Sequence, residues 1–149
     1  MREIEFRGKR IQDNEWVYGF YSQFHNRPVI DEPNSHQIFE VLEDKKSIRI
    51  AGTAIGGVWH IVDNNTISQY TGLKDANGRK IFEGDIIVGD IPELLDSKNL
   101  IGVVEYEESS FVVRFINRQS WEIQRVGFCS FNNYKIIGNK FDNKELMCP

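Results

Sequence analysis

A chain of 149 residues, 40% hydrophobic and 12% aromatic, is long and apolar enough to fold around a core without disulfides or metal. Its net charge of -4, with 18 Lys and Arg dispersed among 22 acidic residues, argues against nucleic acid as a partner, because phosphate contacts need clustered positive charge. The two Cys do not form a disulfide framework, and no stretch has the apolar character of a signal peptide or membrane span, so we expect a cytoplasmic protein.

The chain begins with the pattern of a β-hairpin. Residues 2–7 alternate charged and apolar side chains with a period of two, which predicts a strand whose Ile4 and Phe6 face a core. The aromatic run at 16–21 follows a turn signal and predicts the second strand. We interpret Trp16, Tyr18 and Phe20, which share one face of that strand, mainly as core residues.

Two further features of the first half concern charge and proline. Arg7, Lys9 and Arg10 form the densest basic run, and we interpret them as the solvated face of an edge strand. Residues 22–35 contain two prolines and several turn formers, so we expect a long connection with one short extended piece at 29–30. Further strands are predicted at 37–42 and 58–62, and residues 66–70 lead into the segment described next.

The most informative segment is Gln69–Val88, here called the central motif. Asn77-Gly78 predicts a tight turn in which Asp75 accepts hydrogen bonds from nearby backbone amides. Gly84-Asp85 predicts a second bend that leads into a β-branched strand at 86–88. The residues of this motif that we expect backbone geometry to dictate are Tyr70, Gly72, Leu73, Asp75, Gly78, Gly84 and Asp85.

The second half has the spacing of an antiparallel meander. Strands are predicted at 100–106, 110–116, 120–126 and 134–139, and short helical turns at 91–96 and 143–147. The sequence therefore predicts an all-β, mainly antiparallel fold with an SH3-like barrel-type C-terminal half plus one or two short helical turns. We expect a β-rich N-terminal lobe at 1–68 and a barrel-like C-terminal lobe at 69–149 that share one core.

No residue pattern supports catalysis, a metal or a cofactor. The glycines at 52, 56 and 57 lack the Lys and hydroxyl that a phosphate loop requires, and the Asp75 turn lacks the ligands of a calcium loop. Glu83 and Asp85 could act as an acid and base pair only in a pocket that separates their pKa values. A solvated Glu83 and a turn-stabilising Asp85 are the favoured interpretation.

The aromatic residues of the second half allow two interpretations. Phe111, Trp121 and Phe128 are candidates for a contact surface with another protein or another copy of the chain. Aromatic ladders of this kind also stack single-stranded bases, but the acidic balance of the chain disfavours that use.

The chain resembles the YopX family of phage and prophage proteins over almost its whole length. The resemblance rests on the start at 1–8, the Trp-Val-Tyr-Gly strand at 16–19 and above all the central motif, with Gly102-Val103-Val104 and Ile137-Gly138-Asn139 later in the chain. It implies a small, phage-encoded, β-rich protein of the bacterial cytoplasm that associates with itself. It supplies no catalytic residues.

Three functional hypotheses follow. The favoured one is a non-enzymatic β module that forms a homo-oligomer or binds a host or phage protein. The alternative is a single-stranded nucleic-acid-binding module that uses exposed aromatic side chains. A hydrolase that uses Asp85 or Glu83 is the third and weakest.

Overall fold

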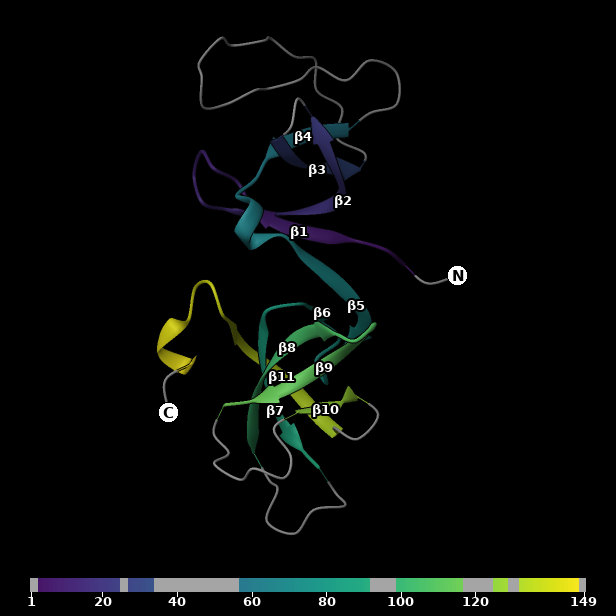
Figure 1. Cartoon of the computed structure of the whole chain (residues 1–149), viewed down its shortest axis with the longest axis vertical. Helices are drawn as coiled ribbons and strands as arrows, with labels where there is room; N and C mark the ends of the chain where they lie inside the picture. The colour runs from purple at the N-terminus through teal and green to yellow at the C-terminus, as the bar shows by residue number, and fades with distance from the viewer. Residues whose placement is uncertain are drawn as a thin grey trace. The chain divides into compact units, whose positions relative to one another are not determined.

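The computed structural model describes residues 3–24, 27–33, 57–91, 99–116, 125–128 and 132–147, which form antiparallel β-sheets (Figure 1). The chain divides into two compact units, Met1–Tyr70 and Thr71–Pro149. Helical structure in the described residues is limited to short 3-10 turns, including η1 (Asn64–Thr66) and η3 (Lys144–Met147). The predicted all-β antiparallel fold is confirmed, and η3 falls on the helical turn predicted at 143–147.

The first unit is an antiparallel sheet. Its strands are β1 (Phe6–Lys9), β2 (Trp16–Phe24), β3 (Arg27–Pro33), β4 (Gly57–Ile61) and the start of β5 (Ser68–Lys74). Their order in the sheet is β4-β3-β2-β1-β5, so β1 and β2 form the predicted hairpin. The core contains the buried Val17 and Val62, against which Phe6, Tyr21 and Ile67 pack.

The predicted edge strand is an interior strand. Phe6 of β1 pairs with Gly19 on one side and with Gln69 on the other. Arg7 and Lys9 are consequently buried, with exposed fractions of 6% and 7%, where a solvated face was expected. The Arg7 guanidinium lies 4.6 Å and the Lys9 ammonium 5.4 Å from the centre of the Trp16 ring, so both cations lie over an aromatic face, which attracts them.

The predicted inward orientation is wrong for several apolar residues of this unit. Ile4 is 55% exposed, and Tyr18 and Phe20 are 44% and 58% exposed. The core is on the opposite face of β2, where Val17 and Tyr21 lie, and side chains on a strand alternate between faces. An apolar run on both faces of a strand does not reveal which face is buried.

The connection expected at 22–35 is largely strand. β2 extends to Phe24, and β3 pairs with it from Phe20↔Asp31 to Phe24↔Arg27 and with β4 from Val29↔Ile61 to Pro33↔Gly57. The two prolines therefore lie in a strand with neighbours on both sides. The strand predicted at 37–42 and the glycines at 52 and 56 lie outside the described residues.

The second unit contains a five-stranded antiparallel sheet. Besides the end of β5, its strands are β6 (Lys80–Phe82), β7 (Asp85–Asp90), β8 (Leu100–Glu107), β9 (Ser110–Phe115), β10 (Arg125–Gly127) and β11 (Asn132–Asn139). Strands β7 to β10 form a meander, and β11 returns to pair with β7, giving the order β10-β9-β8-β7-β11. The buried core is formed by Ile81, Ile87, Ile91, Leu100, Val104, Val113 and Phe115.

Candidate functional site

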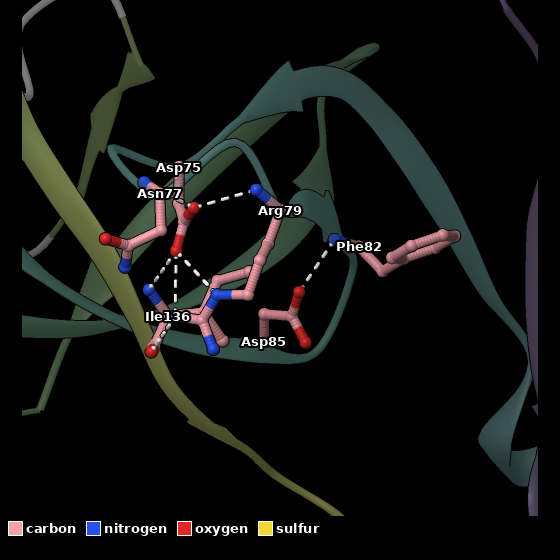
Figure 2. Close-up of polar contacts among 6 residues, drawn as sticks. All are labelled: Asp75, Asn77, Arg79, Phe82, Asp85 and Ile136. Atoms are coloured by element: carbon pink, nitrogen blue, oxygen red, sulfur yellow. Dashed lines mark hydrogen bonds and ion pairs between the residues drawn. The ribbon is translucent and has the colours of Figure 1, made fainter.

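The central motif is organised around Asp75, whose side chain is almost fully buried. Its Oδ1 accepts hydrogen bonds from the backbone N–H groups of Asn77 and Arg79, both at 2.9 Å. Its Oδ2 accepts from the Arg79 side chain, at 3.0 Å from Nε and 2.8 Å from Nη2, and from the backbone N–H of Ile136 at 3.2 Å (Figure 2). One carboxylate therefore fixes the turn between β5 and β6 and ties it to β11.

These hydrogen bonds control the ionisation of Asp75. Burial by itself would raise the pKa of this carboxyl, but hydrogen bonds from the backbone of Arg79 and Ile136, the Arg79 side chain and the Asn77 backbone outweigh it. Together they lower the pKa of Asp75 from 3.8 to about 2. The group is a fixed anion near neutral pH, which suits a structural acceptor and not a proton-transfer catalyst.

The two turn glycines of the motif, Gly78 and Gly84, both have a positive φ of +80°. Gly78 donates its N–H to the Asp75 carbonyl at 2.9 Å, and a Cβ there would point into open space. At Gly84 a Cβ would lie 3.0 Å from the Phe141 ring and 3.1 Å from Lys140 Cε. Gly84 is therefore required both by its backbone conformation and by close packing.

The Gly84 turn joins three segments of the second unit. Gly84 donates to the Val104 carbonyl and accepts from the Lys140 N–H, both at 2.8 Å. The fully buried Asp85 accepts from the backbone N–H of Phe82 at 2.8 Å (Figure 2). Asp85 thus stabilises the turn that precedes β7.

Glu83 was expected to be solvated, but its side chain is half-buried. Burial is the main cause that raises the pKa of Glu83, Glu105 adds to the increase, and the positive charge of Lys140 opposes it. Asp85 faces the backbone of its own turn while Glu83 lies near these charges, so the structure assigns the two carboxylates different surroundings.

The remaining residues of the motif lie along β5. Tyr70 is buried and donates its backbone N–H to the Glu5 carbonyl at 2.8 Å. Gly72 has a positive φ of +88°, and Leu73 is 37% exposed. Thr71, which the sequence did not single out, donates its hydroxyl to the Ile81 carbonyl at 2.9 Å and thereby links β5 to β6.

The structure also places two of the three candidate contact residues. Phe111 and Phe128 are half-buried and pack against the core of the second unit. Tyr106, opposite Phe111 in the β8–β9 ladder, is 54% exposed, and the two rings meet edge to face with centroids 5.1 Å apart. Trp121 lies outside the described residues.

Sequence reasoning missed two donors to Asp75, the Arg79 side chain and the Ile136 backbone N–H. Arg79 could have been found, because it follows Asp75 by four residues across a tight turn, which brings the guanidinium within reach of the carboxylate. Ile136 offers no such signal, because it contributes a backbone N–H from a strand 61 residues later. The Arg79 Nη2 also donates to the Ile136 carbonyl, which completes the link.

The described parts of the chain contain neither a metal-ligand cluster nor a membrane-spanning helix. Within those residues no group of three or more His, Cys, Asp or Glu side chains is arranged to hold a metal ion. No helix in the same residues has the length and apolar character needed to cross a membrane.

The fold and the motif define a small antiparallel β protein in which buried carboxylates hold turns together. Residues 5–148 match the family described as YopX protein, so the chain belongs to the YopX family. No curated protein matches the chain. Among solved structures, the crystal structure of protein EF1440 from Enterococcus faecalis matches over 99% of both chains, with 23% sequence identity and a TM-score of 0.48.

Proposed function

We propose that this member of the YopX family is a non-enzymatic β module, encoded by a phage or prophage, that assembles with itself or binds another protein in the bacterial cytoplasm. The observation that carries the proposal is the exposure of Tyr18 and Phe20, at 44% and 58%, on one face of β2. Neighbouring positions on one strand face form a continuous surface.

Exposed aromatic side chains of this size favour association. Burial of apolar surface contributes about 25 cal/mol per Å², and aromatic residues are enriched in protein interfaces. The first unit also exposes Ile4 and Ile11, at 55% and 54%. A partner that covers these four apolar side chains removes them from water, which favours association.

The central motif supports the non-enzymatic part of the proposal. Its two buried carboxylates, Asp75 and Asp85, accept hydrogen bonds from backbone N–H groups of their own turns. Such groups are engaged in holding the backbone, and a substrate would have to displace those donors. The hydrolase hypothesis would need Glu83 to act without Asp85.

Binding of single-stranded nucleic acid through Tyr18 and Phe20 is a second proposal. Both rings offer stacking faces. The cations nearest to them in the ladder, Arg7 and Lys9, are buried, so they offer little charged surface to a phosphate. Protein association is therefore the better-supported use of this face.

Sedimentation velocity of the full chain from micromolar to millimolar concentration tests self-assembly. We expect concentration-dependent association that Phe20→Ser weakens by about tenfold in Kd, since an aromatic anchor in an interface commonly contributes at least this much. Ile137→Ser, which changes a 41% exposed residue of the second unit, is the control and should associate like the wild type. A wild-type chain that stays monomeric over the whole range would contradict self-assembly.

A further inference from the structure

The turn between β5 and β6 contains the one Asn-Gly pair of the sequence, Asn77-Gly78. Asp75 donates its N–H to the Arg79 carbonyl at 2.8 Å, and Gly78 donates to the Asp75 carbonyl at 2.9 Å. Asn77 has a negative φ and Gly78 a φ of +80°, so the loop is a type I turn followed by a left-handed glycine. Asn77 is therefore held at the second central position of a type I turn.

The Asn77-Gly78 pair carries the groups for a reaction of the chain with itself. The Asn77 side chain is exposed, so water reaches its amide, and Asn is a thermolabile residue in proteins. Gly78 has no side chain, and the place that a Cβ would take is open, with no atom within 4 Å. The Gly78 nitrogen can therefore form a new bond without steric hindrance from a side chain of its own.

Deamidation of Asn77 needs no reagent except water. The Gly78 nitrogen loses its proton to solvent and attacks Asn77 Cγ, which forms the new C–N bond of a five-membered imide. The bond from Cγ to the side-chain nitrogen breaks, and that nitrogen takes up a proton and leaves as ammonia. Water then opens the imide at either carbonyl and yields Asp or an isoaspartyl link, in which the backbone runs through Cβ. No atom is oxidised or reduced.

The folded turn holds Asn77 away from the geometry of this reaction. In a type I turn ψ at this position is about 0°, so the Gly78 nitrogen eclipses the backbone nitrogen of Asn77. Ring closure requires the Gly78 nitrogen to eclipse Asn77 Cβ instead, so the peptide must rotate by one tetrahedral position about the Cα–C bond. That rotation breaks the hydrogen bond from Gly78 to the Asp75 carbonyl.

The carboxylate of Asp75 opposes the same rotation. It accepts hydrogen bonds from the backbone N–H groups of Asn77 and Arg79, on either side of the peptide that must turn. The Arg79 side chain and the backbone N–H of Ile136 hold the carboxylate itself in place. The turn must therefore open before Asn77 can react.

We infer that Asn77 is a site of spontaneous deamidation whose rate is set by opening of the Asp75 turn. Conversion is irreversible, and it adds a carboxylate two residues from the buried anion. An isoaspartyl link also lengthens the turn by a methylene group, which weakens its connection to β11 through Ile136. The inference involves no partner and is independent of the proposed association.

The test follows the full chain in a mildly alkaline buffer by peptide mapping with mass spectrometry, which separates the Asn, Asp and isoaspartyl forms. The same buffer with enough urea to unfold the chain gives the reference rate. We expect the folded chain to react at least about tenfold more slowly, the factor that matches the net contribution of one hydrogen bond. Asn77→Gln, whose longer side chain would need a six-membered ring, should abolish conversion at this position.

Variants assign the protection to the hydrogen bonds of Asp75. Arg79→Ala removes a side chain that is 52% exposed, so the fold should persist while conversion becomes about threefold faster. Asp75→Ala removes the acceptor itself and should accelerate conversion by about tenfold. Arg114→Ala is the matched control, because it removes an arginine that is 54% exposed and paired with Glu105 in the same unit, and its rate should equal the wild-type rate. Hydrogen exchange at β8 measures how often the whole unit opens.

Four outcomes would overturn the inference. The first two are equal rates in the folded and the unfolded chain, and no conversion of Asn77 in the unfolded chain. The third is conversion of Arg79→Ala and Asp75→Ala at the rate of Arg114→Ala. The fourth is acceleration in Arg79→Ala that is matched by faster exchange at β8, which would assign the reaction to unfolding of the whole unit and not to opening of the turn.

Discussion

The two units use buried charge in different ways. In the first unit the buried cations Arg7 and Lys9 lie over the Trp16 ring, and the apolar cluster beneath the sheet contains Val17 and Val62. In the second unit a buried anion, Asp75, is surrounded by hydrogen-bond donors, and the core of its described residues includes seven buried apolar side chains. Cation–π contacts tolerate variation in position, whereas hydrogen bonds to a carboxylate fix direction and distance. Directional hydrogen bonds therefore specify the geometry of buried charge more tightly in the second unit than in the first.

The largest expected loss of stability comes from removing the buried carboxylate of Asp75. Asp75→Ala should destabilise the second unit by about 3 kcal/mol, because it leaves the Arg79 guanidinium and three backbone N–H groups without their acceptor. Urea unfolding with hydrogen exchange at β7 and β8 measures the effect, and amides of β2 serve as the internal reference. If the amides of β7 and β8 were equally protected in the variant and the wild type, Asp75 would not stabilise the second unit.

The same carboxylate gives this effect a defined pH dependence. The pKa of Asp75 is lower in the folded state, about 2, than its ordinary value of 3.8. Its contribution to stability is therefore fully present above pH 3.8 and is lost as the pH falls through about 2. The difference in unfolding free energy between Asp75→Ala and the wild type should shrink across that window and stay constant above it.

The glycine turns give a finer test of how tightly the second unit is specified. Gly84→Val should destabilise by about 2 to 3 kcal/mol, because it combines a strained positive φ with contact against Phe141 and Lys140. Gly78→Val has the same φ but open space around it, so about 1 kcal/mol is expected. Thermal unfolding of both variants should rank them in this order, and the reverse order would contradict the packing at Gly84.

In the core of the first unit we expect an effect smaller than those of Asp75→Ala and Gly84→Val. Val62→Ala removes two methyl groups from a fully buried side chain, which should cost about 1.5 kcal/mol. Hydrogen exchange at β1 and β2, with β7 and β8 as the reference, reports the loss. If Val62→Ala lowered the free energy of unfolding more than Asp75→Ala does, the first unit would be the more tightly specified of the two.

The sequence predicted those features that depend on neighbours along the chain. The turn at Asn77-Gly78, the meander of β8 and β9, and the turn η3 follow from local spacing and from residues that tolerate positive φ. Features that depend on distant partners were not predictable. The pattern of Arg7 and Lys9 is that of an exposed strand, but the strand at Ser68–Lys74 pairs beside them and makes β1 an interior strand.

The site shows the same division between local and distant interactions. Asp75 was identified as the acceptor of its own turn, which needs only local geometry. The donor from Ile136 and the exposure of Tyr18 and Phe20 depend on how strands far apart in sequence come together. Alternation along β2 places Tyr18 and Phe20 on one face, but the packing of Val62 under the other face determines which one meets water.

The hydrogen bonds of Asp75 also bear on the order in which the chain can fold. Its contacts with Asn77 and Arg79 close a loop of a few residues, whereas the donor from Ile136 lies 61 residues further along the chain. The entropy cost of closing a loop rises with its length. During synthesis the local turn can therefore form while its last donor is still being added. Closure of the second unit around this acid must wait until the ribosome has released almost the whole of its sequence.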